Sequence, residues 1–156
     1  MNAGKQIDFG TAKNLSLTPA PIHSDWVMEG RPLARNALLS QSEDGTACTL
    51  IWDCTAGLFN WHYDIDETVY ILEGAVIVQD DNGVIRRLEA GDTAFFPAGS
   101  HAVWRVESYV RKIAFCRRLP HRSYMLAKQL YKTIMRGLGL RKTEAHSTPA
   151  MFGTAR

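Results

Sequence analysis

Short runs of β-branched and aromatic residues alternate with turn-forming residues between Ala34 and Arg117. Runs of about four to eight such residues, bounded by Gly, Pro, Asn, Asp or Ser, are typical of β-strands. Several short strands at close intervals predict an all-β barrel or sandwich. The expected strands are residues 37–40, 46–54, 68–72, 75–78, 93–96, 102–106 and 110–116.

The clearest turn in this pattern is the segment Asp80-Asp81-Asn82-Gly83, which lies between Val78 and Val84. Asn-Gly accepts the positive φ angles that a type I′ turn requires at both central residues. The sequence therefore predicts a β-hairpin here with a type I′ turn.

The hydrophobic period changes after Leu119. Apolar residues then recur at the i, i+3, i+4 and i+7 spacing of one helical face, and they include Leu130, Tyr131 and Ile134. Lysines and arginines lie elsewhere on the same helical surface. The pattern predicts a C-terminal amphipathic helix over residues 119–140, which covers part of the barrel or contacts a partner subunit.

The chain of 156 residues is long enough for one hydrophobic core, so one domain is expected, a barrel over residues 21–118. Residues 1–20 and 141–156 lack periodicity, which indicates a flexible N-terminal arm and a disordered tail. The net charge of +2 gives no strong attraction to nucleic acid. No apolar run reaches the roughly 20 residues that span a bilayer, so no membrane partner is expected.

The three cysteines, Cys48, Cys54 and Cys116, form no CxxC pair, so neither a disulfide framework nor a zinc knuckle is predicted. Cys54 and Cys116 lie in apolar runs, where a free thiol behaves as a small buried hydrophobe. The N-terminus has no apolar stretch of the signal-peptide type. We therefore expect a cytoplasmic protein.

Two motifs carry a resemblance to a known superfamily. Glu67 is followed by six residues and then Gly74, and Gly91 is followed by five residues, Pro97, one residue and Gly99. This spacing resembles the two motifs of the cupins. The resemblance implies a single jelly-roll-like β-barrel, and it implies a homodimer.

The likeness is closer to one branch of the cupins. The pattern W-x-Y-x3-E-T-x-Y-I-L-E-G ends at Gly74, and G-D-x-x-x-F-P-x-G is followed five residues later by Trp104. It resembles the branch that holds ureidoglycine aminohydrolases and the ethanolamine-utilisation acetate kinase. The resemblance covers about residues 22–117.

Metal-binding cupins carry two histidines before the glutamate and one after it. With three residues before Glu67 the first two positions are Trp61 and Tyr63, and with four they are Asn60 and His62. The late position is Ala102, one residue after His101. If Glu67 faces the barrel interior on a regular strand, Trp61 and Tyr63 share its face, because side chains alternate along a strand. A transition metal normally needs three or four converging N, O or S ligands. No cofactor is therefore expected.

An alternative keeps a divalent metal. Its ligands would be His62, Glu67 and His101, brought onto one face by a β-bulge, because one extra residue reverses strand parity. The protein would then be a metal-dependent hydrolase or isomerase of the ureidoglycine aminohydrolase type. If the two histidines have no functional role, both are ordinary surface residues.

The favoured hypothesis is a pocket for a small polar or anionic molecule without a firm metal site. Trp61, Tyr63 and Trp104 would form its apolar walls, Glu67 would orient the ligand, and Lys112 would pair with Glu67 or with an anion. Each of these residues also has a purely structural interpretation, as packing or as a strand ion pair.

Whether the protein is an enzyme stays open at this point. Tyr63 and Glu67 are the candidates for a catalytic acid and base, since burial would raise the pKa of Glu67. A third hypothesis gives the function to the basic helix over residues 119–140, as a docking element for a partner protein.

Overall fold

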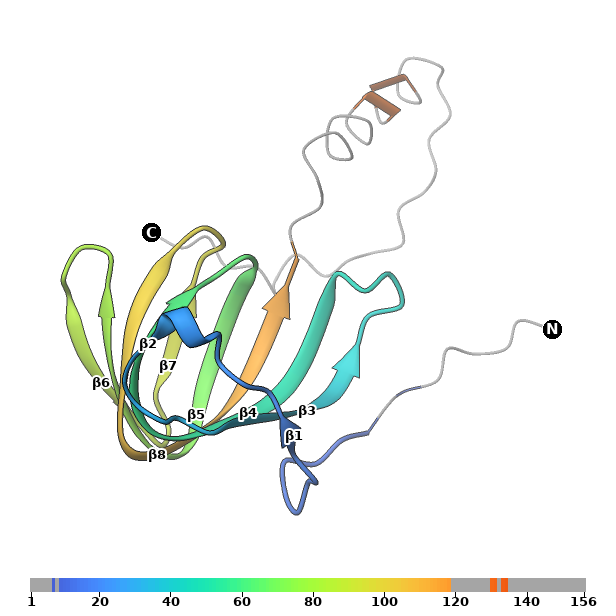
Figure 1. Ribbon diagram of the computed structural model, residues 1–156. Coiled ribbons are helices and arrows are strands. Elements are labelled where there is room, and N and C mark those ends of the chain that lie inside the picture. Colours follow the sequence, from blue (N-terminus) through green and yellow to red (C-terminus); the bar gives the residue numbers. More distant parts are fainter. Residues whose placement is uncertain (1–6, 8, 119–129, 132, 135–156) are drawn as a thin grey trace. The chain divides into compact units, whose positions relative to one another are not determined.

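The computed structural model describes residues 7, 9–118, 130, 131, 133 and 134. Residues 9–118 form an all-β fold, with eight strands in one antiparallel, jelly-roll-like sheet (Figure 1). The elements are β1 (Thr18–Pro19), the 3-10 helix η1 (Ser24–Trp26), β2 (Val27–Gly30), β3 (Ala34–Gln41), β4 (Ala47–His62), β5 (Asp66–Asp80), β6 (Ile85–Glu89), β7 (Thr93–Phe96) and β8 (His101–Arg117).

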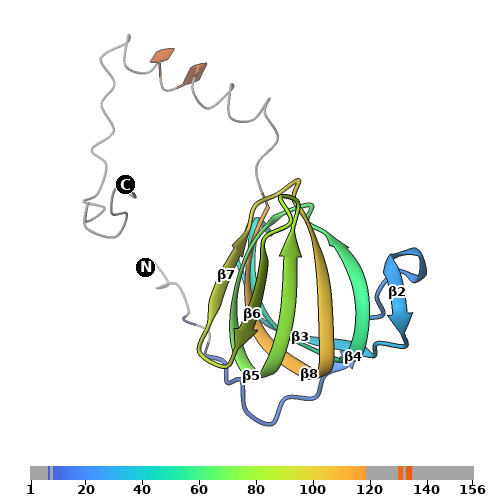
Figure 2. The ribbon, with the colours of Figure 1, turned by 90° about the vertical axis from the view of Figure 1, so that its left-hand side faces the viewer.

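Three long strands, β4, β8 and β5, run side by side in that order in the middle of the sheet (Figure 2). The sequence predicted shorter pieces: 68–72 and 75–78 merge into β5, and 102–106 and 110–116 merge into β8. Register shifts between β4, β5 and β8 let the long strands bend without ending.

One of these bends depends on Gly74. Its φ is +73°, and a Cβ atom there would collide with the carbonyl oxygen of Tyr109 on β8. Only glycine adopts this conformation and leaves this space at no steric cost. The glycine of the first sequence motif thus serves the close contact between β5 and β8.

The hairpin between β5 and β6 is confirmed, but the predicted type I′ turn is wrong. Gly83 has a φ of +79°, whereas Asn14 is the sole non-glycine residue with positive φ in the described part of the chain. Gly83 N–H donates to the Asp80 carbonyl, and the Asp80 carboxylate accepts from the N–H groups of Asn82 and Val84. This pattern fits a three-residue loop in which glycine forms a bulge.

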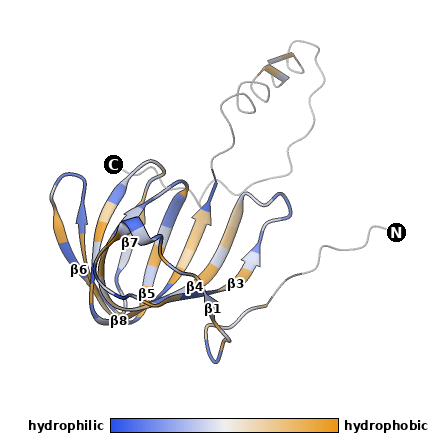
Figure 3. Ribbon diagram, viewed as in Figure 1, coloured by the Kyte–Doolittle hydropathy of each residue, from blue (hydrophilic) through white to orange (hydrophobic). Residues whose placement is uncertain are grey.

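The core lies on the inner face of the bent sheet. The even-numbered residues of β8 from Ala102 to Cys116, except Ser108, are buried, as the alternation of one buried face requires. Figure 3 shows hydrophobic and hydrophilic bands along the strands. Phe59 and Trp104 are among the largest fully buried side chains, and their rings stack at a centroid distance of 6.4 Å. The inner face thus carries the aromatic residues that surround the candidate site.

The predicted ends of the chain are only partly described. Thr18 and Pro19, in the segment predicted to be a flexible arm over residues 1–20, pair with β3 as β1, and Arg111 donates to the carbonyl of Ala12. The predicted helix over 119–140 has four described residues, all helical, and otherwise lies outside the described residues together with the tail 141–156. No helix in the described part is long and apolar enough to cross a membrane.

Candidate functional site

An ion pair lies on the inner face between two neighbouring strands. Lys112 Nζ on β8 donates to Glu67 Oε1 on β5 at 2.6 Å. Both residues are buried, with exposed fractions of 4% for Lys112 and 8% for Glu67. Removing two charges from water is costly, and their attraction offsets this cost only with close contact and further polar partners.

Three tryptophans surround the ammonium group. The distances from Lys112 Nζ to the ring centroids are 4.6 Å for Trp104, 4.9 Å for Trp52 and 6.0 Å for Trp61. An ammonium over an aromatic face is attracted by the ring quadrupole, and the attraction grows when water is excluded. The rings therefore hold the lysine in place while Glu67 balances its charge.

A cavity of about 300 Å³ opens beside this ion pair. Its walls include Asn36, Trp52 and Trp61 besides Lys112 and Glu67. Glu67 Oε1 accepts the bond from Lys112, and no hydrogen bond from any described residue reaches the other carboxylate oxygen. The cavity therefore has apolar walls, ammonium donors and a carboxylate acceptor.

Tyr63 and Trp104 do not line the cavity. Trp104 Nε1 donates to the Tyr63 hydroxyl at 3.1 Å, and the Tyr63 ring stacks on Phe96 at 4.5 Å. Burial, together with the charge of Glu67, raises the pKa of Tyr63 well above its usual range. Tyr63 thus stays a neutral phenol. Of the predicted ligand residues, Trp61, Glu67 and Lys112 line the cavity.

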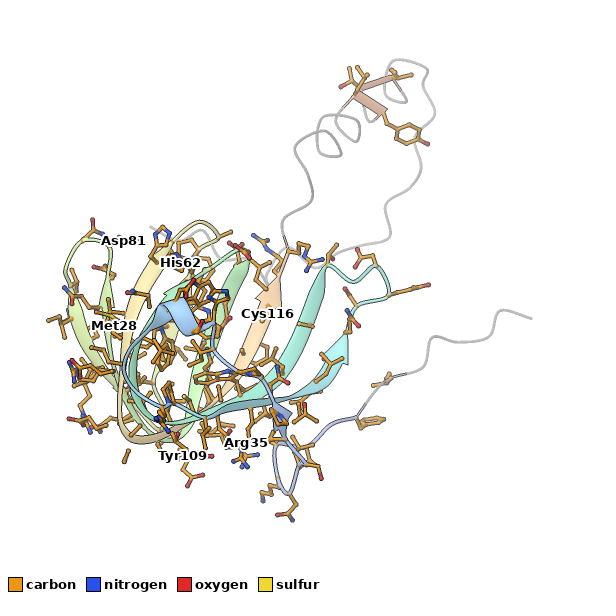
Figure 4. The ribbon with its side chains drawn as sticks, in the orientation of Figure 1. Met28, Arg35, His62, Asp81, Tyr109 and Cys116 are labelled. Carbon is orange, nitrogen blue, oxygen red and sulfur yellow. The ribbon has the colours of Figure 1, made fainter. Side chains whose placement is uncertain are left out.

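The residues of the alternative metal site do not converge. His62 and His101 are exposed cross-strand partners whose rings lie 4.6 Å apart. His101 also faces Asp81, at 3.4 Å from Nδ1 to the carboxylate, and His62 and Asp81 are labelled in Figure 4. Glu67 is instead engaged by Lys112.

Among the described residues, no group of three His, Cys, Asp or Glu side chains could hold a metal ion. Glu67 is a single carboxylate that is already paired with the Lys112 ammonium. This arrangement does not fit the metal ion that cupins often hold. The prediction that no cofactor is bound stays a prediction.

Sequence reasoning missed five residues that line the cavity, and Asn36 and Trp52 are the two among them that lie opposite each other. They are cross-strand partners on β3 and β4, and Trp52 is itself the partner of Lys112 on β8. Trp52 and Cys54 are two residues apart on one strand and therefore share a face. Knowing which face of the run 46–54 points into the barrel would have placed Trp52 inward. Deciding which face points inward requires the register between the strands.

The comparisons with known proteins agree with this fold. The model of a family described as the EutQ-like cupin domain matches residues 41–114, which include the glutamate motif and Lys112. The chain belongs to the cupin superfamily. The narrower likeness to ureidoglycine aminohydrolases stays a prediction. No protein of curated function matches the sequence of this cupin.

Solved structures show the same fold. A protein of unknown function from Pseudomonas syringae pv. tomato is 27% identical with a TM-score of 0.61; the match covers 66% of this chain and 45% of that one. A predicted oxalate decarboxylase from Thermotoga maritima is 17% identical with a TM-score of 0.57, and the match covers 71% and 99%. KdgF from a Halomonas species is 15% identical with a TM-score of 0.53, and the match covers 73% and 96%. This cupin therefore spans less than half of the Pseudomonas protein.

Proposed function

We propose that this cupin binds a small polar or anionic molecule, such as an organic acid or a sugar-like compound, in the cavity beside Glu67 and Lys112. The observation that carries the proposal is a buried ion pair that opens onto a tryptophan-walled cavity. Ligand sites commonly combine apolar walls with a few placed polar groups.

The polar groups define the chemistry of the ligand. An ammonium has three donors, and Glu67 takes one of those of Lys112. The remaining donors suit a carboxylate or hydroxyl oxygen, and the second oxygen of Glu67 suits a hydroxyl donor. A hydroxy acid or a polyol satisfies both, whereas a purely apolar ligand satisfies neither.

The size of the cavity supports a small ligand. About 300 Å³ is at the lower end of the range for small-molecule pockets. Trp52 and Trp61 supply flat surfaces on which a sugar ring or a short carbon chain packs. We propose binding and not catalysis, because Tyr63, the candidate acid, does not line the cavity.

The experiment is a thermal-shift screen of small hydroxy acids, carboxylates and sugars. Wild type is compared with Glu67→Gln, which removes the charge with little change in shape, and with Asp53→Asn, which alters a buried carboxylate on the outer face. We expect a ligand that stabilises wild type and Asp53→Asn but not Glu67→Gln. Equal stabilisation of all three, or none across the screen, contradicts the proposal.

Two further parts of the hypothesis stay proposals. A homodimer rests on the family resemblance alone, and light scattering on the full chain tests it. The metal-dependent hydrolase or isomerase is favoured by no contact in the described residues. Metal analysis of protein purified without a histidine tag tests that alternative.

A further inference from the structure

Two of the three cysteines meet across neighbouring strands. Cys48 on β4 and Cys116 on β8 are direct partners in the antiparallel register, so their side chains leave the same face of the sheet. The next residue in this cross-strand row is Glu67 on β5. The pair therefore lies one strand away from the carboxylate of the proposed ligand site.

The register is compatible with a disulfide between these two residues. Directly opposed residues of an antiparallel pair have Cα atoms roughly 4.5–5.5 Å apart. Disulfides join cysteines whose Cα atoms are roughly 4.4–6.8 Å apart. Both sulfurs are free thiols in this structure.

The pair is open to small reagents on one side. Cys48 and Cys116 both line a second cavity, of about 580 Å³, at the edge of the barrel near Arg117. Cys48 is half-buried, whereas Cys116 is 6% exposed; Figure 4 labels Cys116 on β8. A reagent in this cavity reaches Cys48 more easily than Cys116.

The Cys116 thiol is a weak nucleophile as well as poorly accessible. Burial, with smaller effects from Glu67 and Cys48, raises the pKa of the Cys116 thiol to about 12. The thiolate is the nucleophile, so Cys116 reacts slowly with an oxidant at neutral pH. Cys54 is fully buried and its pKa is also raised to about 12, but its partner on β8 is Val110. Cys54 thus serves as an internal control.

We propose that Cys48 and Cys116 form a modification site, an intramolecular disulfide produced by a hydroperoxide. The Cys48 thiolate attacks the peroxide, the O–O bond breaks, and Cys48 becomes a sulfenic acid while the peroxide leaves as an alcohol or water. The sulfur of Cys116 then attacks the Cys48 sulfur, the S–O bond breaks, and water leaves with the proton of the thiol. A dithiol reductant restores both thiols by exchange.

The experiment treats the full chain with a small molar excess of hydrogen peroxide in mildly alkaline buffer, then alkylates the remaining thiols under denaturing conditions. Trypsin with an aspartate-specific protease cuts before Asp53 and so separates Cys48 from Cys54. Mass spectrometry identifies linked peptides. The variants are Cys48→Ser, Cys116→Ser and Cys54→Ser, and wild type is also oxidised in urea.

We expect a reducible Cys48–Cys116 link in wild type and Cys54→Ser, no link in the other two variants, and a faster reaction at higher pH. The urea sample should give mixed pairings that include Cys48–Cys54, because its chain has no fixed register. The proposal is overturned if Cys48 is over-oxidised or linked to another molecule without the internal link. It is also overturned if all three thiols are still free after the peroxide treatment and are therefore alkylated.

Discussion

Asp53 and Glu67, two of the three acidic side chains buried in the described part of the chain, lie on opposite faces of the same sheet and have different surroundings. Asp53, on the outer face of β4, accepts bonds from Arg35 Nε at 3.0 Å, from Arg35 Nη2 at 2.6 Å and from the Tyr109 hydroxyl at 2.9 Å. Glu67, on the inner face, accepts one bond, from Lys112. Arg35 and Tyr109 are labelled close together in Figure 4.

The difference separates a structural carboxylate from one available to a ligand. Asp53 is 1% exposed, and both of its oxygens are engaged by residues that join β3, β4 and β8. Glu67 keeps one oxygen without a partner among the described residues and lines a cavity. Burial alone therefore does not mark a site; an incomplete set of partners beside open space does.

The largest expected effect comes from Lys112→Met. It leaves the Glu67 carboxylate buried without a donor, which typically costs about 3–5 kcal/mol of unfolding free energy. Arg35→Met should lower stability by less, because Tyr109 still donates to Asp53 and the Arg35 side chain is half-exposed. Urea denaturation measures both, and a greater loss for Arg35→Met contradicts the comparison.

A double substitution sharpens this result. Replacing a buried ion pair by apolar residues of similar volume is often neutral or stabilising by about 1–4 kcal/mol. We therefore expect Glu67→Leu with Lys112→Met to recover most of the stability that Lys112→Met loses, while ligand binding is abolished. Additive losses in urea denaturation would show instead that the pair itself stabilises the fold.

A smaller effect is expected at Tyr63, which does not line the cavity. Tyr63→Phe removes the hydroxyl that accepts the Trp104 N–H bond and leaves a buried donor unsatisfied, at about 1–3 kcal/mol. Ligand affinity should change little, since Tyr63 does not line the cavity. Calorimetry checks both quantities, and a loss of affinity with unchanged stability would place Tyr63 in the site.

The smallest effect is a pH dependence at the outer face. Burial and the bond to Asp53 raise the pKa of Tyr109 to about 12. Because the folded state holds this proton more tightly, the stabilisation is complete below the ordinary pKa of about 10 and is lost as pH rises towards 12. Tyr109→Phe should lack this part of the alkaline loss. Equal slopes of unfolding free energy against pH for both proteins would contradict it.

Much of the barrel could be predicted from local patterns. The run Thr93–Phe96 identifies a strand, and Gly74, Gly91 and Pro97 mark bends and strand ends. Glycine and proline can be interpreted locally because they act on the backbone at their own positions. The sequence left a gap between the expected strands 102–106 and 110–116, yet β8 passes through it, since pairing with β4 and β5 continues on both sides. Local polarity cannot report such pairing.

The site was predicted in part for the same reason. Strand parity assumed one regular strand through residues 61–67, whereas β4 ends at His62 and β5 begins at Asp66. Trp61 and Glu67 nevertheless line the same cavity. Lys112 lies opposite Ile71 and not Glu67 in the register, so its ion pair depends on a long side chain running along the sheet. Predicting that Trp52 lines the cavity would have required the register of β4 with β8.

The most direct test of the central claim, that the incompletely partnered Glu67 marks the ligand site, is a tryptophan fluorescence titration with a ligand from the screen. Three of the four tryptophans surround Lys112, so binding there should change the emission. We predict saturable binding by wild type and Asp53→Asn, and at least about tenfold weaker binding by Glu67→Gln, as expected for the loss of one charge-assisted hydrogen bond. Equal affinity for wild type and Glu67→Gln, with binding lost in Asp53→Asn that is still folded, would contradict the account.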